Sequence, residues 1–477
     1  MCNNKINKTL VILLAGTLIT LLSSCERDPE KPDLPEETLI LNHWIWEGMN
    51  DVYLWEQHIP DLDPDYEFDS EAYFYKLLYK EDKYSWIVND YKELAAMFDG
   101  IELATGVSAR PGLITENQVI SIVEYVTPNS PGADSGIVRG DIILAIDGQS
   151  LNTDNYYPLY YQTTATLEFG DWDGTAVIPN GKKVTLTAVV LNQNPVIHRE
   201  VIDYEGSKIG YLVYTQFTDG QSDEWLDEIN TVFDEFIAAG VSEVVVDLRY
   251  NRGGSLDLSA YIASSLGPVS AMQDNDVYVR LVWNNYYNDF WMEYDFDDDG
   301  KPDGEDSEQL VIKLPESERN LNLSRICFLT TDITASASES LMIGLYPYAD
   351  VVQIGDTTNG KCYGSITVDD FADPKRHNWA MQPLVIKYAN SVGFTDFVEG
   401  LLPDYPIEEN LLYAEPFGSF SDPLLATALE EITGVAPALK KASEPMGQFT
   451  ALPVPRKHLM ERKMEWPEEL LNRWRQR

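Results

Sequence analysis

Hydroxyl side chains gather in the stretch TDITASASESLMIGL, which begins at Thr331. A serine or threonine becomes a nucleophile when a base removes its proton and nearby N–H groups stabilise the oxyanion that forms. The same residue types also cap helices, and a helix is expected here over residues 337–346, ending near Pro347. The stretch therefore indicates either a nucleophile or a capped helix.

The chain offers few bases for such a nucleophile. None of its five histidines lies in a recognisable triad, and the sequence contains neither a GxSxG turn nor an HExxH helix. A lysine can act as the base only when its amine is neutral, which requires burial or a neighbouring cation to lower its pKa from about 10.4. Lys361 follows a predicted strand and a glycine-containing turn, although a lysine in a polar turn is usually solvated.

Together, TASASES and IGDTTNGK resemble the tail-specific, or carboxyl-terminal processing, serine protease family. In that family the middle serine of a [ST]ASASE motif is the nucleophile, and a lysine in a G..T.GKG turn follows 25 residues later. The resemblance implies that Ser336 is the nucleophile and that Lys361, 25 residues further on, is its base. Thr334 is then expected to cap the helix.

A third motif, VVVDLRYNRGG, resembles the DLRxNxGG sequence that ends a buried strand in this family. It implies that an N–H of Gly253 or Gly254 joins the N–H of Ala337 in an oxyanion hole, and glycine lets the backbone approach a substrate closely. Many members carry Gln or Glu four residues beyond the lysine, where it orients the amine. Ser365 stands there in this chain, and its shorter reach makes it a weaker third member of the site.

The elements that must position these residues begin with residues 38–100, where large apolar side chains recur at helical spacing. We expect a helical N-terminal domain with Trp44, Trp46 and Tyr53 in its core.

Residues 101–195 carry short β-branched runs around the stretch SPGADSGIVRGD, which resembles the PDZ domains of secreted proteases. Such domains bind peptide ends as an added strand, and the resemblance places a carboxylate-binding loop at Gly106, Val107 and Ser108.

Strand and helix patterns alternate over residues 196–435, as in an α/β layer. The family resemblance implies an α/β serine protease core of the ClpP/crotonase-like type, so the chain as a whole is expected to be multidomain α/β (α+β). Residues 436–477 form a proline-punctuated, mildly basic extension to which no function is assigned.

The first 24 residues have two lysines, a short apolar run and the ending LSSC, which resembles a bacterial lipobox. The resemblance implies a signal peptide over residues 1–24, a lipid on Cys25 and a charged tether over residues 25–37. The protein would then be anchored to the outer membrane of a bacterial envelope, facing the periplasm or the surface. An ordinary signal peptide with a chance cysteine is the alternative.

Acidic residues outnumber basic ones 78 to 34, giving a formal net charge of −44. This charge disfavours nucleic acid or an anionic membrane as a partner of the folded body. Outside the leader and lipobox only Cys327 and Cys362 remain, either as free thiols or as one disulfide.

A second site is suggested by DFDDDGKPDGED, in which Asp295, Asp297, Asp299 and Asp306 approach the spacing of a calcium loop. A solvated acidic insertion is the alternative, and the serine chemistry itself requires no cofactor.

The sequence therefore predicts a lipid-anchored serine endopeptidase that captures and cleaves envelope polypeptides. The alternatives are a catalytically weak or inactive peptide-binding lipoprotein and a calcium-dependent surface adhesin, and the oligomeric state stays open.

Overall fold

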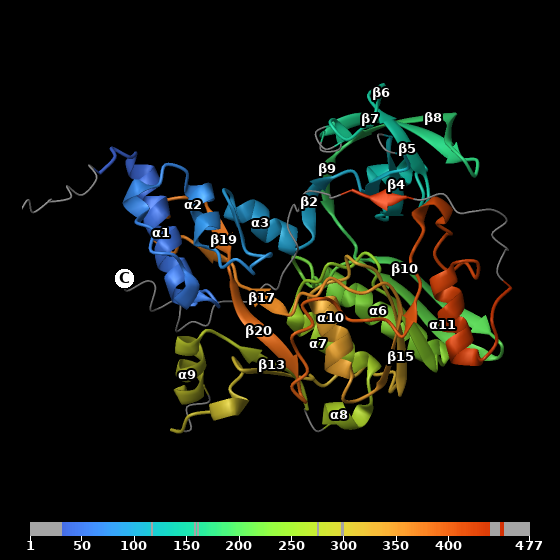
Figure 1. The fold of residues 1–477 in the computed structure, drawn as a ribbon. Helices are drawn as coiled ribbons and strands as arrows, with labels where there is room; N and C mark the ends of the chain where they lie inside the picture. The colour runs from blue at the N-terminus through green and yellow to red at the C-terminus, as the bar shows by residue number, and fades with distance from the viewer. Residues whose placement is uncertain are drawn as a thin grey trace, which may run out of the picture.

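The computed structural model describes residues 31–115, 118–156, 159, 162–273, 276–296, 300–438 and 449–452. The expected leader, Cys25 and most of the C-terminal extension lie outside these ranges. The described chain forms an N-terminal helical region, a β-rich region and a larger α/β region (Figure 1). Within the described residues, no helix combines the length and apolar character needed to cross a membrane.

The N-terminal region buries Trp44 and Tyr53, as predicted, but the prediction for Trp46 is wrong because its side chain is 38% exposed. Trp46 lies on the side of its helix opposite to Trp44, facing away from the core. The region contains two short 3₁₀ helices, three α-helices and one short strand; the last four are α1 (Glu36–Val52), α2 (Ser70–Leu77), β1 (Trp86–Val88) and α3 (Tyr91–Phe98).

The β-rich region is a sheet in which five strands pair in the order β3-β4-β5-β7-β8, with β22 on the outer edge of β3. A short helix, α4, follows β4, and a separate pair of strands, β2 and β9, leads into and out of the region. The elements are β2 (Ile101–Ala104), β3 (Val107–Leu113), β4 (Val119–Val126), α4 (Pro131–Asp134), β5 (Ile142–Ile146), β6 (Gln149–Ser150), β7 (Thr164–Trp172), β8 (Val177–Thr187), β9 (Val189–Asn192) and β22 (Thr450–Ala451).

The α/β region is built on a six-stranded sheet of order β10-β11-β12-β15-β16-β21. Only β10 is antiparallel to its neighbour, and the strands from β11 onward are parallel. The strands are β10 (Val196–Tyr204), β11 (Ser207–Tyr214), β12 (Glu243–Asp247), β15 (Arg325–Thr330), β16 (Asp350–Gly355) and β21 (Tyr405–Pro406).

Helices cover both faces of this sheet, which is usual for parallel strands whose residues are buried on both sides. Leu212 of β11 packs in the core shared with α6, α7 and α10, whereas the adjacent Tyr211 packs in the core shared with α11. The helices are α6 (Glu224–Ala239), α7 (Leu256–Leu266), α10 (Ala337–Leu345) and α11 (Pro423–Thr433). These strands and helices confirm the alternation predicted from the sequence.

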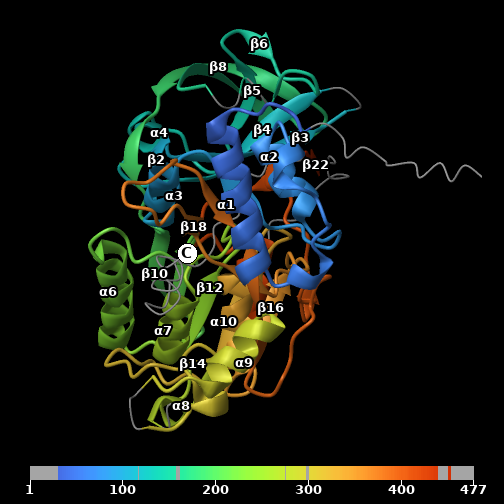
Figure 2. The same ribbon diagram turned by 90° about the vertical axis from the view of Figure 1, so that its left-hand side faces the viewer.

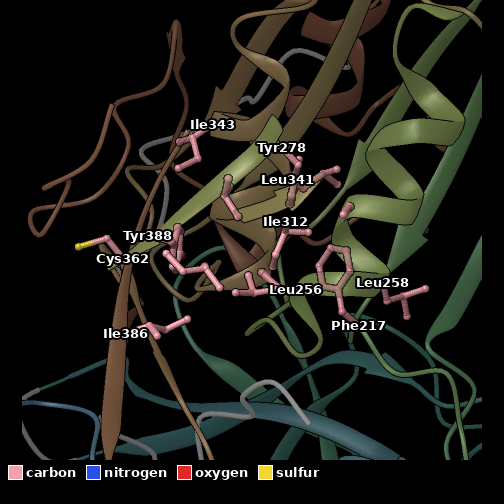
Figure 3. Close-up of a cluster of buried hydrophobic side chains, with 14 of the residues drawn as sticks. Phe217, Leu256, Leu258, Tyr278, Ile312, Leu341, Ile343, Cys362, Ile386 and Tyr388 are labelled. Carbon is pink, nitrogen blue, oxygen red and sulfur yellow. The ribbon is translucent and has the colours of Figure 1, made fainter. Parts of the chain in front are cut away.

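A second sheet, of order β14-β13-β20-β17, packs against α10 and α7 (Figure 3). Tyr278 and Tyr388 from this sheet lie in one buried cluster with Leu341 and Ile343 from α10. The elements here are α8 (Val269–Gln273), β13 (Val277–Val282), α9 (Asn285–Glu293), β14 (Val311–Lys313), β17 (Tyr363–Ser365), β18 (Val368–Asp369), β19 (Ala380–Gln382) and β20 (Leu384–Asn390). Strand β19 pairs with β1, so a small sheet joins the N-terminal region to the α/β region.

Cys327 and Cys362 are free, buried thiols. Burial raises the pKa of Cys327 to about 12 and that of Cys362 to about 11, which keeps both as inert, protonated core groups.

Candidate active site

Ser336 lies where the chain turns from β15 into α10, and it is the N-cap residue of that helix. Its φ of 58° falls in the left-handed region that non-glycine residues rarely occupy, which indicates local backbone strain. The expectation that Thr334 caps the helix is wrong. Its hydroxyl instead donates to the carbonyl of Leu248, directly after β12 (2.8 Å), and accepts from the Thr331 N–H. These two hydrogen bonds connect the turn before α10 to the end of β12.

Lys361 lies in the turn between β16 and β17 and is fully buried. Its amine nitrogen lies 5.2 Å from the centre of the Tyr84 ring, and the Tyr84 hydroxyl donates to Asn359 Oδ1 (3.0 Å). Burial takes the amine out of water, which disfavours its charged form. Tyr84 comes from the loop before β1, so the N-terminal region helps to cover the lysine.

Glu339, on the first turn of α10, links the backbones of Ser336 and Lys361. One of its carboxylate oxygens accepts from the Ser336 N–H (2.8 Å) and from the Lys361 N–H (2.9 Å). The other accepts from the Gly360 N–H (2.7 Å) and the Thr358 hydroxyl (2.5 Å). Burial raises the pKa of Glu339, while these four hydrogen bonds act in the opposite direction.

Tyr388 provides a second link between the backbones of Ser336 and Lys361. Its hydroxyl lies 3.1 Å from the Ser336 carbonyl oxygen and 2.6 Å from the Lys361 carbonyl oxygen, and it can donate to either. The structure therefore brings together the two positions that the sequence motifs singled out, with Glu339 and Tyr388 between them. The prediction did not include Glu339 or Tyr388. The last letter of SASE was the available signal for Glu339, whereas nothing local marks Tyr388.

The Gly-Gly turn after β12 packs directly against the start of α10. A Cβ atom on Gly253 would lie 2.7 Å from Ser336 Cβ and 3.1 Å from the Ala337 nitrogen. Gly253 and Gly254 have φ angles of 110° and 138°, which favour glycine. The Gly253 N–H already donates to Asn251 Oδ1 (2.8 Å). Gly253 and Ala337, two of the three residues predicted for an oxyanion hole, thus lie beside Ser336, and Gly254 follows Gly253 in the turn, where it packs against Phe217.

Ser365 is fully buried on β17, and its hydroxyl donates to Gln382 Oε1 (2.7 Å). Gln382 lies on β19 and is paired with Trp86 of β1, so it belongs to the small sheet that joins the two regions. Sequence reasoning did not find Gln382, because Gln382 and Ser365 lie on different strands and no short motif contains both residues.

Of the loop predicted at Gly106, Val107 and Ser108, only Gly106 lies between β2 and β3, whereas Val107 and Ser108 are the first residues of β3 because they pair with Val126 and Tyr125 of β4. The Gly106 carbonyl accepts from the Thr127 N–H (2.8 Å), and the Ser108 hydroxyl donates to Glu124 Oε2 (3.0 Å). Ser108 and Gly253 line the same cavity, of about 200 Å³. This cavity connects the expected peptide-binding loop with the Gly-Gly turn.

The acidic stretch gives no metal cluster within the described residues. Asp295 Oδ2 accepts from the Gly300 N–H (2.8 Å), and Asp306 lies in a short 3₁₀ turn. Asp297 and Asp299 lie outside the described residues.

Three family profiles match the chain. Residues 41–86 match the N-terminal domain of peptidase S41, residues 122–159 match a PDZ domain, and residues 208–407 match peptidase family S41 itself. These segments correspond to the three regions of the fold and contain Ser336, Lys361 and the Gly-Gly turn.

Individual proteins agree with the profiles. Carboxyl-terminal-processing peptidase 2 of the Arabidopsis thaliana chloroplast is 27% identical over 323 residues, which are 65% of this chain and 54% of that protein. This chain thus spans about half the length of its curated relative. A crystal structure from Bacteroides fragilis NCTC 9343, provisionally described as an S41 protease, is 27% identical with a TM-score of 0.68, covering 86% of this chain and all of the other.

Proposed function

We propose that this chain, which belongs to peptidase family S41, acts as a serine endopeptidase of the carboxyl-terminal processing type. The observation that carries the proposal is the pair of links through Glu339 and Tyr388. They hold Ser336 and Lys361 together, beside N–H groups suited to an oxyanion. Its substrates are polypeptides, taken up with the help of the PDZ domain.

In the proposed reaction, the neutral amine of Lys361 takes the hydroxyl proton as Ser336 Oγ bonds to the scissile carbonyl carbon. The resulting oxyanion faces the N–H of Ala337 at the start of α10, where the positive end of the helix dipole lies. Because the Gly253 N–H already donates to Asn251 Oδ1, we assign the Gly254 N–H as the second hydrogen-bond donor to the oxyanion.

The tetrahedral intermediate then collapses. Its C–N bond breaks, the Lys361 ammonium returns the proton to the departing amine, and an ester of Ser336 remains. A water molecule attacks this ester in the same way, with Lys361 taking its proton, and Ser336 is regenerated as the acid product leaves.

Turnover of β-casein, an unfolded protein, tests the proposal. Ser336→Ala should lower kcat by about 10⁴-fold or more, because the nucleophile is lost. Ser340→Ala is the matched control, since this buried hydroxyl on the same helix bonds to Tyr278 and not to the site, and it should keep most of the activity. Equal activity of Ser336→Ala and the parent chain would reject the assignment.

A second candidate function, peptide binding without cleavage, is favoured by one observation. Ser365 replaces the longer residue usual in the family, and its proton is already donated to Gln382. A fluorophosphonate probe separates the two functions: labelling of Ser336 that disappears in Lys361→Ala supports the enzyme, and absence of labelling in both chains supports the binding protein.

We propose a lipid anchor on Cys25 from the LSSC leader alone, with envelope polypeptides as the substrates. Cells grown with a clickable palmitate analogue should label the parent chain but not Cys25→Ala, and the variant should leave the membrane fraction. A label that persists in Cys25→Ala would show that the lipid is elsewhere.

Calcium at the stretch from Asp295 to Asp306 is a secondary proposal based on ligand spacing. Calorimetric titration with CaCl₂ showing neither heat nor a thermal shift would dismiss it.

A further inference from the structure

The outer edge of the PDZ sheet is covered by the chain's own late segment. Strand β22 pairs antiparallel with β3, with Thr450 opposite Leu113 and Ala451 opposite Gly112. The Leu452 N–H continues this ladder by donating to the Pro111 carbonyl (2.8 Å). Figure 2 shows β22 beside β3 at the margin of the β-rich region.

This edge is the one along which a bound peptide would lie. Strand β3 starts at Val107, directly after Gly106 of the expected carboxylate-binding loop, and its other edge is occupied by β4. A peptide whose carboxyl end is held at that loop must run antiparallel to β3. Strand β22 has this direction, because its residue numbers rise as those of its partners on β3 fall.

The side chains of the segment also fit as those of a bound peptide would. Leu452 packs on the apolar cluster that contains Ala109 of β3 and Leu159. Phe449 packs on the opposite face of the sheet, with Ile120 and Leu411, and its ring lies over Gly112, where a Cβ would come within 2.4 Å of it. Main-chain pairing along a sheet edge is the mode by which such domains bind ligands, and the segment adds one apolar anchor on each face of the sheet.

We infer that Phe449–Leu452 is an internal ligand of the PDZ domain, which an incoming polypeptide must displace from β3. The inference rests on the proposed function, because it names the competitor at the site that captures substrate. The segment covers Pro111 to Leu113, so a polypeptide held at the loop by its end would meet it along β3. Tethering gives this competitor a high effective concentration.

The first experiment measures peptide binding in trans, in the Ser336→Ala background. The probe is a fluorescein-labelled peptide of residues 448–454, Gln-Phe-Thr-Ala-Leu-Pro-Val. We expect a chain that ends at Gln448 to bind it about tenfold more tightly than the full chain, because the tethered competitor is gone. A probe with proline at the position of Leu452 should bind weakly, since it lacks the N–H that reaches Pro111.

A point variant covers the case in which truncation impairs folding. In the full chain, Leu452→Pro removes the same N–H and should raise probe affinity, whereas Thr450→Ala alters an exposed side chain and should leave affinity unchanged. In the active chain, Leu452→Pro should lower KM for β-casein about threefold with kcat unchanged.

Equal probe affinity of the full chain, the truncated chain and Leu452→Pro would overturn the inference. This binding test uses an inactive chain, so it stands even if β-casein is never cleaved, which would instead overturn the proposed function.

Discussion

At the scale of single residues, Glu339 is the group on which the site depends most. Its two oxygens accept four hydrogen bonds, and both positions of the proposed dyad contribute one of them. Replacing the carboxylate by an amide would turn an acceptor into a donor that faces N–H groups.

We therefore expect Glu339→Gln to lower kcat about 100-fold and to cost about 2–4 kcal/mol of unfolding free energy, because buried donors lose their acceptor. β-Casein turnover and urea unfolding measure the two effects. Wild-type kcat in a folded Glu339→Gln chain would show that this carboxylate does not position the dyad.

Gly253 gives a second prediction at this scale. Gly253→Ala should reduce activity at least about 100-fold, because its Cβ would press on Ser336 and push the oxyanion donors away. Gly136→Ala is the matched control: its φ is 69°, also positive, but a Cβ there meets nothing within 4 Å. It should cost only about 1 kcal/mol of stability and keep full activity. Equal losses in both variants would point to backbone strain instead of a clash at the site.

At the scale of elements, the loop before β1 covers the lysine. Tyr84→Ala removes the ring over the Lys361 amine and lets water into this part of the site, so we expect kcat/KM for β-casein to fall about tenfold. Tyr84→Phe keeps the ring and loses the bond to Asn359, so its kcat/KM should stay close to that of the parent chain. Steady-state kinetics with β-casein measure this effect, and equal kcat/KM values for Tyr84→Ala and the parent would contradict it.

The elements also show what the sequence could predict. Periodicity and turn residues identified β4, β5, β11, β12, β15, β16, α6 and α10, because these signals are local. The motif spacing placed Ser336 and Lys361 correctly at the start of a helix and in a turn. Tyr84, Tyr388 and Gln382 escaped prediction because their contacts join distant segments, and Thr334 was misassigned because a tertiary hydrogen bond uses its hydroxyl.

At the scale of the whole molecule, buried charges join the PDZ domain to the α/β region. Arg139, just after α4, and Arg249, after β12, both donate to Glu409 Oε1 (2.6 and 2.8 Å). Burial alone would raise the pKa of Glu409, but the two guanidinium groups outweigh it and lower the pKa to about 2.

This link makes stability depend on pH. The folded pKa of Glu409 lies below its value of 4.5 in the unfolded chain, so its contribution is complete above about pH 4.5 and is lost as the pH falls towards 2. Glu409→Gln should cost about 3–5 kcal/mol at pH 7, and less at pH 3, because buried Arg139 loses its carboxylate partner and buried Arg249 keeps only Asp247 and Asp422. Denaturant unfolding at both pH values tests this, with exposed Glu408→Gln as the control expected to change little. An equal loss of unfolding free energy in Glu409→Gln at pH 3 and at pH 7 would contradict this pH dependence.

The pairing of β1 with β19 has a consequence for biosynthesis. Trp86 must find Gln382, and only then are Tyr84 and Ser365 held in their places around the lysine. A ribosome releases these partners nearly three hundred positions apart, and such distant pairings form late. A nascent chain therefore carries Ser336 before the surroundings of Lys361 are assembled, so we expect the proposed activity only after Gln382 has been synthesised.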